Sequence, residues 1–77
     1  MQERQYTIVV IPEPEEGGYS VLVPALPGCV TQAETVEDAI AMAEDAITGW
    51  IAVAEKHGET VPEERESART ITVTVAA

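Results

Sequence analysis

One long amphipathic segment does most to limit the folds open to this chain. Apolar residues recur every three or four positions between Val36 and Ala54, at positions 36, 39, 40, 43, 46, 47, 50, 51 and 54. This spacing predicts an α-helix of about 22 residues with one apolar stripe. Thr35 suits the N-cap, Asp38 stands at the capping-box position, and Gly58 suits the residue just past the C-terminal end. The rest of the chain must supply the surface on which this stripe packs.

Short apolar runs typical of strands make up that remainder. Residues 6–11 (YTIVVI) and 19–23 (YSVLV) flank the turn-forming stretch PEPEEGG, which predicts a hairpin. We expect a third short strand from Cys29 and a fourth at residues 70–75 (TITVTV), where apolar residues alternate with threonines. The predicted order is β-β-β-α-β. This is an α+β fold with an antiparallel three-stranded sheet, a crossover helix and a fourth strand.

The first strand raises a packing problem, because it is apolar on both faces while one helix covers only one face. The uncovered face carries either the odd-numbered or the even-numbered residues of 6–11. An exposed apolar face of this size is typical of a protein–protein interface. We therefore expect a homo-dimer or tetramer, partner binding, or both. The predicted interface residues are Tyr6, Ile8, Val9, Val10, Ile11, Tyr19 and Val21.

The charge of the chain narrows the class of partner. Fourteen acidic residues against four basic ones give a formal net charge of −10. A phosphate backbone repels such a surface, so we predict no direct nucleic-acid binding. A basic protein is the natural electrostatic complement, although acidity also keeps a small domain in solution.

Cys29 and His57 are the residues with the most reactive side chains. Cys29 precedes the predicted helix start by six residues, and a free cysteine is more often a small buried apolar residue than a nucleophile. His57 stands at the C-terminal end of the predicted helix, where a histidine suits the helix dipole. We predict no enzyme activity and no catalytic residue.

Metal and cofactor binding have weak support in the sequence. Four acids could in principle form a two-metal site, but most lie in a turn where solvation explains them more simply; they are Glu13, Glu15, Glu16 and Glu34. Zinc, phosphate-loop and dinucleotide motifs are absent from the sequence. We therefore expect no metal and no cofactor.

Length and targeting signals point to a cytoplasmic protein. The 77 residues suffice for a single domain, residues 1–77. One cysteine cannot form an intrachain disulfide, and the first residues lack the features of a signal peptide. No apolar run approaches the roughly 20 residues that cross a bilayer. We predict a cytoplasmic protein without membrane contact.

The middle of the chain resembles a known family. Residues 17–40 read GGYSVLVPALPGCVTQAETVEDAI, and the acidic helix that follows ends in HGETVPE. This string is similar to the N-terminal domain of HicB-type antitoxins, over about residues 6–75. We expect a structural role for the motif residues and for Trp50 on the helix stripe. The full set is Gly18, Pro24, Pro27, Gly28, Cys29, Thr35, Asp38, Trp50 and Gly58.

The resemblance implies a fold and a role. The fold is a partial RNase H-like one of the same β-β-β-α-β order. The role is neutralising a small basic mRNA-cleaving toxin by direct binding. Such antitoxins usually carry a C-terminal DNA-binding domain; this chain stops at Ala77, so we predict no such domain and no operator binding. The alternative is a stand-alone homo-oligomeric regulatory or scaffold module without a toxin partner.

Overall fold

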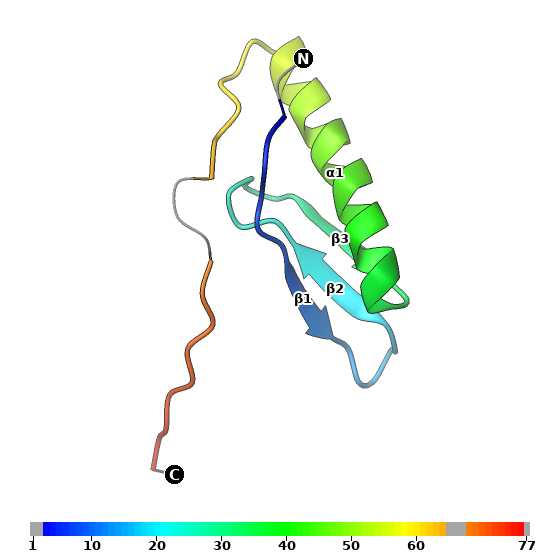
Figure 1. The fold of residues 1–77 in the computed structure, drawn as a ribbon, viewed down its shortest axis with the longest axis vertical. Helices are drawn as coiled ribbons and strands as arrows, with labels where there is room; N and C mark the ends of the chain where they lie inside the picture. Colours follow the sequence, from blue (N-terminus) through cyan, green and yellow to red (C-terminus); the bar gives the residue numbers. More distant parts are fainter. Residues whose placement is uncertain (1–2, 65–67, 77) are drawn as a thin grey trace.

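The computed structural model describes residues 3–64 and 68–76 and shows one sheet beside one helix (Figure 1). The elements follow the order β1 (Val9–Pro12), β2 (Tyr19–Leu22), β3 (Val30–Ala33) and α1 (Val36–Lys56). The sheet is antiparallel throughout, with strand order β1-β2-β3. An α+β fold with a three-stranded antiparallel sheet followed by a helix is thus confirmed.

The turn between β1 and β2 depends on two glycines in the left-handed region. Gly17 has a φ of +82° and Gly18 a φ of +73°, which side-chain-bearing residues rarely adopt. The Gly17 N–H donates to the Glu13 carbonyl at 2.7 Å, and the Glu13 N–H donates to the Gly18 carbonyl at 3.0 Å. Gly18 also passes close to β3, where a Cβ would lie 2.7 Å from the Ala33 carbonyl oxygen. The PEPEEGG stretch therefore closes the predicted hairpin.

Helix α1 begins and ends where its sequence signals predict. Thr35 has extended backbone angles, and its Oγ1 accepts a hydrogen bond from the Asp38 N–H at 3.0 Å. Glu37 and Asp38 place negative charge in the first turn, which suits the positive end of the helix dipole. Gly58 ends the helix with a φ of +70°. The helix has 21 residues, close to the predicted length.

The core lies between the sheet and the helix. Val21 and Ala33 of the sheet pack with Ala39 and Ala43 of α1, and Ile8, Val10 and Ile47 close the edges of this cluster. The alanines let the helix backbone come near the strands. A second cluster formed by Val23, Leu26 and Cys29 packs against Tyr6 and Trp50. The core is small, and α1 covers only one face of the sheet.

Two strand predictions differ from the structure. The first strand is Val9–Pro12, shorter than the predicted 6–11, since β2 pairs only with residues 9–12. Residues 68–76 contain no strand, so the fourth strand predicted at 70–75 does not form in this structure. That segment lies apart from the sheet and the helix in Figure 1, and Ile71, Val73 and Val75 are 74–81% exposed. Alternating apolar residues form a strand only where a neighbouring strand completes their hydrogen bonds.

Candidate partner-binding surface

The face of the sheet that points away from α1 carries a group of apolar side chains, two of them exposed and two half-buried. The register places Val9, Leu22 and Val30 opposite one another, in one row across the three strands. This row lies on the outer face, because side chains alternate along a strand and Val21, next to Leu22, points to the helix. Val30 is 62% exposed, and Ile11, two residues beyond Val9 on the same face, is 43% exposed. We call these four residues, Val9, Ile11, Leu22 and Val30, the open face.

The open face has an acidic border at the β1–β2 turn. Ser20 lies beside Ile11 in the next row, and its hydroxyl donates to the Glu13 Oε1 at 2.7 Å. Glu15 and Glu16 are exposed in the same turn. Glu13, Glu16 and Glu34 line a shallow hollow of about 580 Å³ at this end of the sheet. Apolar side chains are thus followed by carboxylates across one continuous surface.

The seven predicted interface residues divide between the two sides of the sheet. Val9 and Ile11 belong to the open face. Ile8 and Val10 pack with Val21 in the covered core, and Val21 is completely buried. A partner on the open face can therefore contact the odd-numbered residues of the first strand but not Val21. The interface itself stays a prediction.

The two tyrosines of that set have local roles. Tyr19 is half-buried and lies on the same side of β2 as Val21. Tyr6 packs against the cluster at the corner, and its hydroxyl donates to the Pro62 carbonyl. Sequence reasoning missed Leu22 and Val30. The alternation within YSVLV held the signal for Leu22, because burial of Val21 forces its neighbours outward.

Residues 23–29 form the corner that joins β2 to β3. Hydrogen bonds within the corner run from the Leu26 N–H to the Val23 carbonyl and from the Cys29 N–H to the Leu26 carbonyl, both at 3.0 Å. The indole Nε1 of Trp50 donates to the Pro27 carbonyl at 2.9 Å and ties the corner to α1. Burial raises the pKa of the Cys29 thiol, which lowers its nucleophilicity at neutral pH. Of the motif residues in the corner, Cys29 is buried in the second cluster, whereas Pro24, Pro27 and Gly28 are exposed.

The described residues show little that bears on metal or membrane binding. Within residues 3–64 and 68–76, no three or more His, Cys, Asp or Glu side chains are grouped so that they could hold a metal ion. His57 is exposed at the C-cap of α1. In the same part of the chain, no helix combines the length and the apolar character needed to cross a bilayer.

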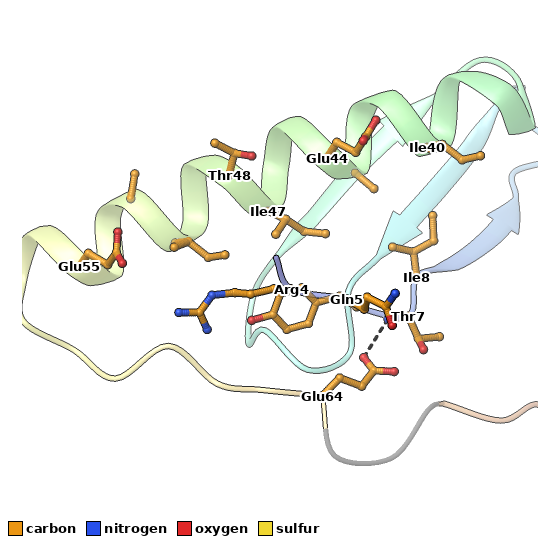
Figure 2. Close-up of a pocket in the computed structure, with 14 residues that line it drawn as sticks. Arg4, Gln5, Thr7, Ile8, Ile40, Glu44, Ile47, Thr48, Glu55 and Glu64 are labelled. Carbon is orange, nitrogen blue, oxygen red and sulfur yellow. Dashed lines mark hydrogen bonds between the residues drawn. The ribbon is translucent and has the colours of Figure 1, made fainter. Parts of the chain in front are cut away.

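A second surface feature is a groove of about 1170 Å³ between α1 and residues 4–8 (Figure 2). It exists because α1 packs mainly on β3 and β2, which leaves the β1 side of the sheet uncovered. Its apolar lining includes Ile8, Ile40, Ile47 and Ile51, and its charged lining includes Arg4, Glu44, Glu55 and Glu64. The Thr7 N–H donates to the Glu64 Oε1 at 2.8 Å on the side away from the helix. Sequence reasoning did not foresee this groove.

Comparisons with known proteins place the chain in a family. Residues 6–74 match the family model described as HicB_like antitoxin of bacterial toxin-antitoxin system. A UPF0150 protein of Thermoplasma acidophilum is 45% identical over 69 residues, which are 90% of this chain and 96% of that protein. A UPF0150 protein of Archaeoglobus fulgidus is 40% identical over 45 residues, which are 58% of this chain and 65% of that protein. The matched region includes the three strands, the corner and the helix, so this chain belongs to the HicB_like antitoxin family.

Proposed function

We propose that this chain neutralises a small basic toxin protein by binding it across the open face. The observation that carries the proposal is the apolar row Val9, Leu22 and Val30, in which Val30 is exposed and the other two are half-buried. The acidic border around Glu13 lies beside it, along the strands. Apolar side chains at the centre of an interface with charged groups at its rim are the usual arrangement of a specific protein–protein contact. Membership of an antitoxin family supports the choice of a toxin as the partner.

Charge supports a basic partner. At a net charge of −10, the chain attracts a cationic protein over a distance of about one Debye length, roughly 8 Å at physiological salt. Electrostatic attraction of this kind raises the association rate and weakens as salt is added. The bound toxin is expected to be one that cleaves mRNA, and its capture would keep it from RNA in the cytoplasm. No catalytic step is assigned to the antitoxin chain.

Capture from the host tests the partner. The tagged full chain is expressed in its native host, and proteins that co-purify in stoichiometric amount are identified by mass spectrometry. We expect one small basic protein, whose purified form cleaves RNA and loses that activity when one equivalent of this chain is added. Recovery of no small basic protein would instead favour the homo-oligomeric scaffold without a toxin.

Two matched substitutions test the surface. Val30 on the open face and Val53 on α1 are 62% and 58% exposed, so Val30→Lys and Val53→Lys make the same chemical change at nearly equal exposure. We expect Val30→Lys to weaken toxin binding about tenfold or more, because it places a cation within the contact. Val53→Lys should bind like the wild type in isothermal titration calorimetry. Equal losses of affinity in both variants would show that the added charge weakens toxin binding wherever it is placed, and would contradict binding at the open face.

A further inference from the structure

The groove beside β1 lies next to an open sheet edge. β1 is an edge strand, and no other strand of residues 3–64 and 68–76 pairs with its outer side. Across the hairpin the Glu13 N–H donates to the Gly18 carbonyl, two residues along the register from the pair Ile11 and Ser20. Because backbone groups alternate in direction along a strand, the N–H groups of Val9 and Ile11 face β2, and the N–H and carbonyl of Val10 point to the outer side. The edge therefore offers the backbone groups of Val10 in line with an apolar groove.

Residues 68–76, which we call the arm, have the composition of the missing strand. Ile71, Val73 and Val75 alternate with threonines and are 78%, 74% and 81% exposed. In a strand these three side chains would share one face, and the threonines would share the other. The arm contains Arg69 and no acidic residue, whereas three glutamates and one cation, Arg4, line the groove. An apolar stripe with one cation thus fits an apolar groove with an acidic margin.

The arm of the same copy is badly placed to fill this groove. Pro62 and Glu64 contact Tyr6 and Thr7, so the chain already runs beside residues 6–7 when it reaches position 64. At about 3.3 Å per residue, Ile71 would lie some 23 Å further along an extended chain, whereas Pro12 ends β1 only about 17 Å beyond Thr7. A fully extended connection would thus carry the apolar residues of the arm past the end of their own β1, and Figure 1 shows the arm standing off from the sheet.

We propose that the arm of a second copy of this chain lies in the groove as an added strand beside β1, with Ile71, Val73 and Val75 against Ile8, Ile40 and Ile47. Each copy lends its arm to the other, so the contact is two-fold symmetric and closes as a dimer. Main-chain hydrogen bonds to the β1 edge supply affinity, and the alternating apolar side chains set the register. The exchange supplies the fourth strand in trans and leaves the open face clear for a different partner.

Sedimentation equilibrium on the full chain at micromolar concentration tests the exchange. The wild type should have twice the mass of one chain. Val73→Asp places a charge on the face of the arm that enters the groove and should reduce the mass to that of one chain, with unchanged helical circular dichroism. Thr72→Asp makes the same kind of change on the opposite face and should leave the mass doubled. A wild type with the mass of one chain, or a Val73→Asp variant that stays dimeric, would overturn the proposal.

Cross-linking separates exchange between copies from docking within one copy. In a Cys29→Ala background, one tagged chain carries Ile40→Cys in the groove and a second, differently tagged chain carries Val73→Cys in the arm. The two chains are co-expressed and treated with a short bismaleimide. We expect a covalent pair that carries both tags. A third chain with both substitutions shows whether the arm reaches its own groove, and an intrachain product without the two-tag pair would refute the exchange.

Discussion

The two faces of the sheet differ far more than their sequences suggest. Neighbouring residues of one strand, Val21 and Leu22, point to opposite sides; Val21 is completely buried, whereas Val30, in the row of Leu22, is 62% exposed. The covered face meets alanines of α1, which bring the helix close, while α1 does not cover the open face (Figure 1). The difference suggests that stability resides on one face and recognition on the other.

Equal charges placed on the two faces give the largest expected contrast. Val21→Asp buries a carboxylate without a partner, which we expect to cost about 4 kcal/mol or more of unfolding free energy. A domain of this size has little more stability than that, so the variant should be largely unfolded by circular dichroism. Leu22→Asp on the open face should change the unfolding free energy by about 1 kcal/mol or less in urea titrations.

The same pair of variants can also break the comparison. If Leu22→Asp unfolded the chain as readily as Val21→Asp, the open face would have to be buried in the isolated protein, and recognition of a partner there would lose its basis. If both variants stayed folded, the packing of Val21 against Ala39 and Ala43 would contribute much less than its burial indicates.

The hairpin turn offers a smaller contrast between a packed and an open position. Gly17 and Gly18 both have positive φ, but a Cβ at Gly18 would lie 2.7 Å from the Ala33 carbonyl oxygen, and a Cβ at Gly17 would meet nothing within 4 Å. We expect Gly17→Ala to cost about 1–2 kcal/mol for the backbone conformation alone. Gly18→Ala should cost at least about 1 kcal/mol more, because β2 and β3 must separate to admit the methyl group. Thermal unfolding of the two variants measures the difference, and equal costs would show that the turn moves freely relative to β3.

Local signals predicted the elements that local interactions form. Thr35, Asp38 and Gly58 bound the helix where their cap chemistry predicts, since caps act within a few residues. The two glycines likewise predicted the hairpin turn. The strand predicted at 70–75 does not form, because the alternating pattern shows only that the segment is able to form a strand. Whether it does so depends on a neighbouring strand edge, and none of the three strands of the sheet pairs with it.

The candidate surface was predicted in kind but not in detail. One helix and one long apolar strand sufficed to infer an uncovered face. The sequence could not decide which residues occupied it, because the run 6–11 is apolar at both parities and the register with β2 was unknown. The groove depends on the lateral position of α1 over β2 and β3, and no short-range pattern encodes that position.

Two adjacent positions at the start of β3 give the subtlest contrast between the faces. Cys29 is buried with Val23 and Leu26, whereas Val30 is exposed on the open face. We expect a maleimide to modify Val30→Cys, made in a Cys29→Ala background, at least about tenfold faster than it modifies Cys29 in the wild type at neutral pH. Guanidinium chloride should abolish the difference. Equal rates in the folded state would show that the corner opens readily.

The pH dependence of stability should report the same burial. The pKa of the Cys29 thiol is raised in the folded chain because burial disfavours the thiolate. The folded state therefore holds this proton more tightly than the unfolded state does. The resulting stabilisation is fully present below the unfolded pKa of about 8.5 and is lost as the pH rises through the folded value. In urea titrations between neutral pH and pH about 10, the wild type should lose more stability than Cys29→Ala, since the variant lacks this ionisation. If the unfolding free energies of the two proteins changed with pH in parallel, water would have to reach the thiol in the folded state. The corner would then be as accessible to solvent as the open face.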